Sequence, residues 1–137
     1  MIELEPEDFR EIEIFAREVL GCGCPDEVFH NISVEKDPAS FAGLPVDYLV
    51  RIGGRLMIGV TPELHSDEAA SQLQRLLETG RDLRDREGFN RFRLVFISDD
   101  PANMQKSIEM NLTGFSGLDD RIHVHAVRPG SLPRCCQ

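Results

Sequence analysis

Two cysteines separated by a single glycine are the residues of this sequence best suited to chemistry. They lie in the stretch Gly21-Cys22-Gly23-Cys24-Pro25. The spacing is short enough for both sulfurs to bind one metal ion, or to bond to each other in a dithiol/disulfide pair. An ordinary turn carrying two reduced thiols fits the same spacing, so the motif alone does not choose between these chemistries.

Other potential metal ligands lie near the end of the sequence. Cys135 and Cys136 are adjacent, and four cysteines in two pairs match the ligand number of a tetrahedral zinc site. His123 and His125 project from one face of a predicted strand, where a tail cysteine can complete a mixed nitrogen–sulfur site, although two such histidines can equally be plain polar surface. The candidate zinc ligands are therefore Cys22, Cys24, Cys135, Cys136, His123 and His125, with a narrower alternative in which Cys22 and Cys24 bind metal with other partners.

We call the stretch from Gly21 to Pro25 the elbow. The elements on either side of the elbow must position its two thiols. Apolar residues in the segment 7–20 recur at the three-and-four spacing of one helix face. Gly21 suits the left-handed position after a helix end, and Pro25 suits the first turn of a short helical element reaching about residue 29. We therefore expect Cys24 at or near the N-cap of that element, where unpaired amides lower the pKa of a thiol.

Five segments have the composition of strands. Their residues are 29–36, 46–52, 55–61, 92–97 and 122–127. The second and third are joined by Gly53-Gly54, which predicts a two-residue hairpin because both glycines can adopt positive φ. The fourth is apolar on both faces apart from Arg93, so it is expected to be covered on both sides and to form the centre of the sheet.

Two further helices are predicted, over residues 66–86 and from Pro101 to about residue 112. In the first, Gly80 lies on the apolar face and would let the helix approach a sheet, whereas the charged residues, Arg84 among them, are expected on a solvated face. Before the second stands Ser98-Asp99-Asp100, which either binds a cation or supplies the helix cap at Asp100.

This order of elements predicts an α/β fold with one mixed five-stranded sheet. The first half of the sheet should be antiparallel and the second half parallel, with helices on both faces. Residues 1–130 are expected to form a single domain, and residues 131–137 a flexible tail that carries two cysteines.

The order of one helix, three strands, one helix and one strand resembles the core of the restriction-endonuclease-like nucleases over about two thirds of the chain. That resemblance implies an aspartate on the second strand and an acidic-x-Lys triplet on the third. Asp47 can stand at the first position, but residues 56–60 (Leu-Met-Ile-Gly-Val) offer neither the acid nor the lysine. No nuclease activity is therefore expected.

Composition excludes several classes of partner. With 15 basic and 24 acidic residues the formal net charge is -9, which argues against nucleic acid as a partner. No segment has the roughly 20 consecutive apolar residues of a membrane span, and the first residues are acidic where a signal peptide is basic. We therefore expect a cytoplasmic protein without a membrane partner, large enough to bury a core without metal.

Three functions remain open from the sequence. The first is a small soluble module without catalysis that binds a metal or a protein partner through the Cys22/Cys24 elbow. The second is a thiol-redox enzyme or carrier in which the same two cysteines cycle between dithiol and disulfide. The third is a structural or regulatory interaction protein without a site, and the oligomeric state is open in all three.

Overall fold

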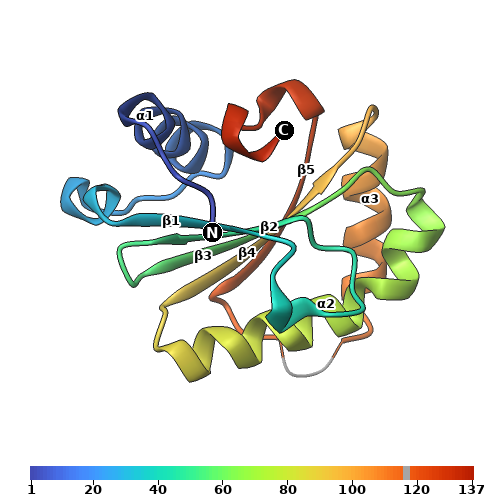
Figure 1. Cartoon of the computed structure of the whole chain (residues 1–137). Coiled ribbons are helices and arrows are strands. Elements are labelled where there is room, and N and C mark those ends of the chain that lie inside the picture. Colours follow the sequence, from blue (N-terminus) through green and yellow to red (C-terminus); the bar gives the residue numbers. More distant parts are fainter. Residues whose placement is uncertain (116–117) are drawn as a thin grey trace.

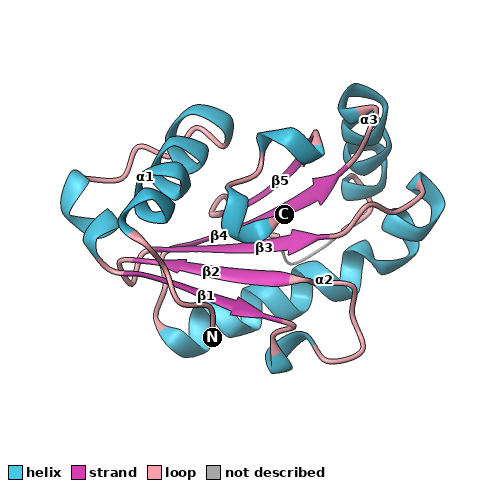
Figure 2. Ribbon diagram, turned by 45° about the horizontal axis from the view of Figure 1, so that its top comes forward, coloured by secondary structure: helices cyan, strands magenta, loops and turns pink. Residues whose placement is uncertain are grey.

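The structure, a computed structural model describing residues 1–115 and 118–137, contains one five-stranded sheet between two layers of helices (Figures 1 and 2). The strands lie in chain order, β1-β2-β3-β4-β5. β1 to β3 pair antiparallel, and β3 to β5 pair parallel, as predicted. Their bounds are β1 Ile32–Lys36, β2 Tyr48–Ile52, β3 Leu56–Thr61, β4 Arg91–Ile97 and β5 Ile122–Val127.

The predicted hairpin is present between β2 and β3. Gly53 and Gly54 have φ values of 56° and 67°, and Ile52 pairs with Leu56 across the turn. Positive φ at both central positions is the geometry that a tight antiparallel turn with matched strand twist requires. The turn therefore fixes the register of the antiparallel half of the sheet.

One face of the sheet is covered by the N-terminal segment. The helix α1 (Pro6–Ile14) runs directly into a π-helical turn, Phe15–Val19, so the predicted helix is present with its last turn widened. Ile12 and Phe15 are buried against the sheet residues Val34 and Ile58 in a common apolar cluster. This packing holds the end of the helix over β3 and β4 (Figure 2).

The opposite face is covered by α2 (Ser66–Glu87) and α3 (Pro101–Leu112). Gly80 of α2 faces Phe92 of β4 so closely that a β-carbon at this position would overlap the Phe92 ring. Phe92 also stacks on Phe41, with ring centroids 6.2 Å apart. The predicted close approach of this helix to the sheet is confirmed.

One expectation about position is corrected. β4 is interior and buried, but the centre of the sheet is β3, because β5 adds only one strand beyond β4 whereas β1 and β2 lie on the other side. Residues 131–137, expected to form a flexible tail, lie against α1 in the structure, and their flexibility stays a prediction. Leu132 and Cys136 are buried, and Arg134 forms ion pairs with Glu7 and Glu11 of α1.

Arg84 does not lie on a solvated face, as the charge pattern of α2 suggested. Its side chain is 1% exposed and binds both carboxylate oxygens of Asp119, at 2.9 and 2.6 Å, as well as Asp85. The bidentate geometry compensates the desolvation of the buried guanidinium. It ties the end of α2 to the segment that leads into β5.

None of the helices in the described ranges combines the length and the apolar composition of a membrane span.

The contact between Gly80 and Phe92 predicts that Gly80→Ala destabilises the fold. Alanine improves helix propensity by about 1 kcal/mol, but the added methyl must displace a fully buried ring, which typically costs about 1–3 kcal/mol. The net loss should appear as a lower free energy of unfolding in urea. Arg75→Ala, at an exposed position of the same helix, is the control and should be nearly neutral. A stabilised Gly80→Ala protein would contradict the packing described.

The Arg84–Asp119 pair predicts a loss of stability in acid. The Arg84 guanidinium lowers the pKa of Asp119 from 3.8 to about 2. Because the folded pKa lies below the unfolded one, the stabilisation is present above about pH 4 and is lost as the pH falls toward 2. Asp119→Asn should remove this step from a plot of unfolding free energy against pH, whereas Asp85→Asn should keep it.

Candidate functional site

The elbow that carries Cys22 and Cys24 begins where the first helix ends. The π turn closes with the Leu20 N–H donating to the Phe15 carbonyl, at 3.1 Å. The Cys22 N–H donates to the Ala16 carbonyl, at 2.8 Å, and Gly21 has a φ of 77°. Gly21 thus occupies the left-handed position predicted for it, and the chain turns sharply toward the sheet.

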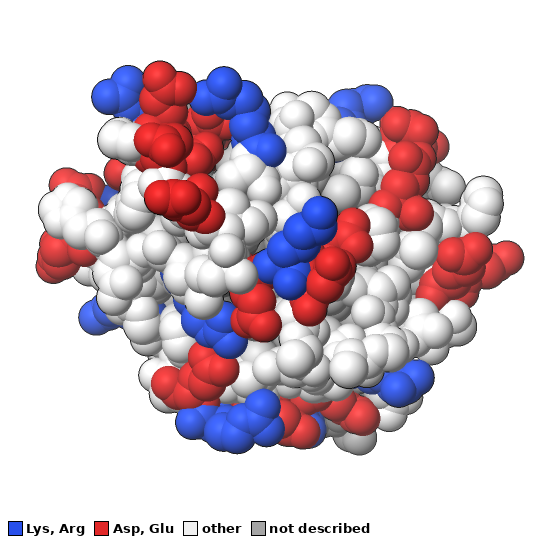
Figure 3. Space-filling view, viewed as in Figure 1, with Lys and Arg blue, Asp and Glu red and all other residues white. Residues whose placement is uncertain are grey.

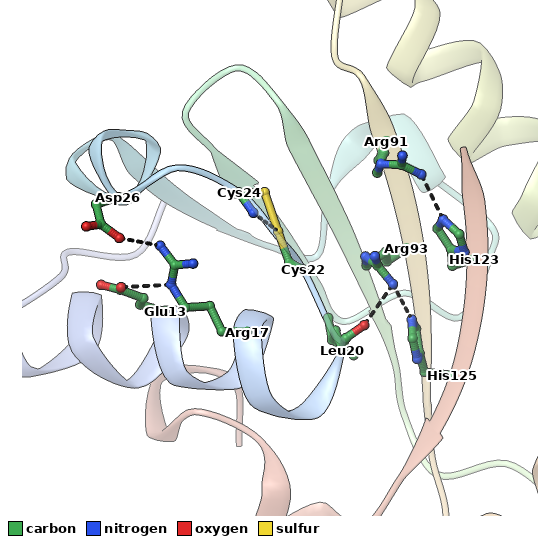
Figure 4. Close-up of a disulfide and its surroundings, with 10 residues drawn as sticks. All are labelled: Glu13, Arg17, Leu20, Cys22, Cys24, Asp26, Arg91, Arg93, His123 and His125. Carbon is green, nitrogen blue, oxygen red and sulfur yellow. Dashed lines mark hydrogen bonds and ion pairs between the residues drawn. A yellow bond between two sulfur atoms is a disulfide. The ribbon is translucent and has the colours of Figure 1, made fainter. Parts of the chain in front are cut away.

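On the other side of the elbow the chain enters a short 3-10 helix, Asp26–His30. Pro25 is its N-cap, so Cys24 lies next to the N-cap, within the range predicted for it. Arg17 spans the two elements, binding Glu13 at 3.0 Å and Asp26 at 2.7 Å while its guanidinium lies over the buried Phe29 ring (Figure 4). The elbow is therefore held at both ends by contacts that do not involve its sulfurs.

Cys22 and Cys24 are joined by a disulfide (Figure 4). Their Cα atoms are 5.6 Å apart, a separation usual for bonded cysteines. Cys22 is 7% exposed, whereas Cys24 is only partly buried. The Cys24 N–H donates to the Cys22 sulfur at 3.3 Å. Cys24 is thus the more exposed residue of the pair, and the Cys22 sulfur has a hydrogen-bond donor beside it.

The disulfide borders a cavity of about 250 Å³ at the starts of β3 and β4. Three of its lining residues are arginines and none is acidic. The lining residues are Cys22, Gly23, Cys24, Arg55, Leu56, Asn90, Arg91 and Arg93. The cavity therefore places a disulfide beside a group of positive charges.

Arg93 is the most buried of these arginines, at 8% exposure. Its Nη1 donates to the Leu20 carbonyl at 2.9 Å and to His125 Nε2 at 2.9 Å, while its Nε is buried without a partner. Burial first, and the charge of Arg91 second, lower the pKa of Arg93. No carboxylate forms an ion pair with Arg93 in residues 1–115 and 118–137. The positive charge of Arg93 is therefore met only by neutral hydrogen-bond acceptors.

His123 and His125 face these arginines from β5 (Figure 4). Arg91 Nη1 lies 3.1 Å from His123 Nε2, matching the Arg93–His125 contact. An arginine can only donate, so each Nε2 accepts and each ring is neutral. Burial, followed by the charge of Arg93, lowers the pKa of His125 to about 4 and also lowers the pKa of His123.

The structure does not gather the predicted zinc ligands. In the described ranges, no group of three or more His, Cys, Asp or Glu side chains is arranged to hold a metal ion. Cys22 and Cys24 are bonded to each other, and the Nε2 atoms of His123 and His125 are occupied by arginines. Zinc binding by these residues stays a prediction that the geometry does not favour.

The tail cysteines lie elsewhere. The sulfurs of Cys135 and Cys136 are 3.6 Å apart, and Cys136 lines a separate cavity of about 570 Å³ with Asp47, Tyr48 and Glu63 among its walls. The hydrogen bond between the two thiols, with burial, raises the pKa of Cys136, and the same bond lowers that of the more exposed Cys135. The sequence motif Cys135-Cys136 is thus not part of the elbow cavity.

The disulfide cavity lies at the amino ends of the parallel strands, opposite to the carboxyl ends where open α/β sheets usually bind ligands. At the carboxyl end, Asp100 accepts a hydrogen bond from the Asn103 N–H and caps α3, as one of the two interpretations predicted. Asp99 raises the pKa of Glu63 by a shared hydrogen bond.

Sequence reasoning missed Arg55, Arg91 and Arg93. Arg93 carried a usable signal, since it is the single charged residue in a segment otherwise apolar on both faces, and a charge in a covered strand is rare unless it has a partner or a function. Arg91 precedes it by two residues and therefore shares its face of the sheet. Nothing in the sequence linked either residue to the cysteines.

The burial of His125 and its contact with Arg93 predict a histidine with an unusually low pKa. An NMR titration should give His125 a pKa of about 4, against an ordinary 6.5. Because the unfolded chain binds the proton more readily, the stability of the fold should decrease as the pH falls from about 6.5 to about 4. Arg93→Met removes the neighbouring charge and should raise the pKa of His125. A wild-type His125 that titrates near 6.5 would contradict the contact.

A comparison of the sequence with models of protein families finds no match, and a comparison with curated proteins finds no recognisable relative.

Proposed function

We propose that this protein exchanges thiols and disulfides through Cys22 and Cys24. The observation that carries the proposal is a disulfide closed across one residue at the wall of a cavity, with Cys24 only partly buried and Cys22 buried beside a hydrogen-bond donor. Exposed disulfides are the ones that enter exchange reactions, whereas structural disulfides are buried and inert.

The disulfide is expected to contribute only part of the stability of the fold. In the chain-entropy description a ring closed across one residue stabilises by about 1.6 kcal/mol, against about 3 kcal/mol for a loop of roughly 15 residues. Arg17, with its contacts on both sides of the elbow, and Arg93, bound to the Leu20 carbonyl, position this segment by contacts that do not use the sulfurs. The pair can therefore be reduced without unfolding the chain.

Exchange with a thiol substrate proceeds in two balanced steps. A substrate thiolate attacks the Cys24 sulfur, forms a mixed disulfide and releases Cys22 as a thiolate, which takes a proton from water. A second substrate thiolate then attacks the substrate sulfur of the mixed disulfide and releases Cys24. Two thiols become one disulfide, and the two electrons that they lose reduce the elbow pair to the dithiol.

The surroundings of Cys22 support its role as the leaving group. Its sulfur accepts the Cys24 N–H, and positive groups on β4 border the same cavity. Hydrogen-bond donors and nearby cations favour a thiolate over a thiol. A thiolate that is better stabilised leaves a disulfide faster.

Two other interpretations have less support. A metal- or partner-binding module was the leading expectation from the sequence, but the predicted ligands are not gathered and the elbow thiols are bonded to each other. The resemblance of the element order to restriction-endonuclease-like nucleases carries no proposed activity, because β3 supplies neither an acidic residue nor a lysine.

The proposal predicts the behaviour of the four thiols. In air-oxidised native protein Cys135 should alkylate, the buried Cys136 should react far more slowly, and a mild dithiol should release Cys22 and Cys24 while the circular dichroism spectrum stays native. Cys22→Ser and Cys24→Ser should each abolish the oxidation of an added dithiol, whereas Cys135→Ser should not affect it. A disulfide that resists reduction until the protein unfolds would rule out an exchange function.

A further inference from the structure

The charge around the elbow cavity is opposite to that of the whole protein. The chain has 24 acidic and 15 basic residues, and acidic groups gather over α1 on the face drawn in Figure 3, with basic groups beside them. The cavity walls contain three arginines and no acidic residue. A local excess of positive charge in an acidic protein concentrates anions at that place.

These arginines also have N–H groups that form no hydrogen bond. Arg93 Nε is buried without a partner, and Arg93 uses only Nη1 for hydrogen bonds. Arg91 likewise uses only Nη1, for the Asp120 carbonyl at 3.3 Å and for His123. Arg55 forms no side-chain hydrogen bond or ion pair with any part of the chain that the structure describes. A guanidinium that is buried or crowded by like charge is stabilised by a carboxylate, sulfonate or phosphate.

The groups that contact Arg91 and Arg93 do not supply this negative charge, although Asp119 and Asp120 act on His123 from a longer range. The histidines that contact Arg91 and Arg93 are neutral, and the Leu20 carbonyl provides only the partial charge of a helix end. Two arginines side by side on β4 repel each other, and this repulsion contributes to the lowered pKa of Arg93. An anion in the cavity would relieve that repulsion.

We propose that Arg55, Arg91 and Arg93 bind the anionic group of a small thiol, and so select anionic thiols as substrates of the Cys22–Cys24 disulfide. The part of this inference that concerns substrates rests on the proposed exchange function, whereas the anion site itself does not depend on it. The cavity of about 250 Å³ suits a small molecule rather than a protein segment. Its walls include both Cys24 and the arginines, so one compact ligand can contact both.

Binding of the anion has a direct kinetic consequence. It raises the local concentration of the substrate beside the Cys24 sulfur, and electrostatic attraction of this kind accelerates encounter by about 10-fold to 1000-fold at low salt. The effect should diminish as salt is added, because charges at an open cavity are screened within about 10 Å at 0.1 M. The reaction rates of neutral thiols should not be raised by this attraction.

The test compares small thiols that differ mainly in charge. Reduction of the elbow disulfide is followed with 2-mercaptoethanesulfonate, 2-mercaptoethanol and cysteamine, and each rate is divided by the thiolate fraction at the working pH. We expect the anionic thiol to react at least about 10-fold faster than the cationic one at low salt. The double variant Arg55→Gln/Arg91→Gln should bring the two rates together, whereas Arg75→Gln, an exposed arginine of α2, should leave the ratio unchanged. Arg93 is kept because it holds the Leu20 carbonyl.

A second measurement reads the anion site without exchange chemistry. Methanesulfonate, which has no thiol, is titrated into oxidised protein while the Gly23, Cys24 and Asn90 amide signals are followed by NMR. Saturable shifts in the wild type that disappear in the double variant are expected. Equal corrected rates for all three thiols, or shifts that persist in the double variant, would overturn the anion site and leave the exchange function standing. Saturable binding without exchange would leave the anion site and overturn the exchange function.

Discussion

Arg93 is buried on the face of the sheet that α1 covers, and its charge has to be satisfied there without a carboxylate from the described residues. A guanidinium stays protonated even when buried, so its donors must find acceptors. The Leu20 carbonyl at the end of the first helix is one, and His125 on β5 is the other. These two bonds join the helix end, β4 and β5, and they fix the place at which the chain turns into the Cys22–Cys24 elbow.

The two buried arginines of this protein show what that arrangement means. Arg84 forms ion pairs with Asp119 and Asp85, so its charge is balanced within the fold. Arg93 is matched only by neutral groups and keeps an unpartnered Nε. A buried charge without a counter-ion is costly, so the position of Arg93 beside a cavity is what supports the proposed anion site, whereas a fully paired charge such as Arg84 needs no ligand.

The elbow combines a fixed backbone with a disulfide that adds little to stability. Gly21 turns the chain, and Arg17 connects the elements on either side. The sulfurs are therefore positioned by the fold and not the reverse. This separation is what an exchange site needs, because the same groups must stay in place while the bond between Cys22 and Cys24 is made and broken.

The sequence alone determined the elements of this protein and singled out the Cys22–Cys24 motif. Periodicity, the Gly53-Gly54 turn and the Asp100 cap are local signals, since they depend on residues within a few positions of each other, and the structure confirms them. Only tertiary structure decided which motifs meet. The elbow lies beside Arg91 and Arg93, which come about 70 residues later in the chain. They meet because the crossover after β3 returns the chain to β4, parallel to β3. Burial of Arg84 and separation of the tail cysteines from the elbow were likewise decided by long-range packing, which no local spacing encodes.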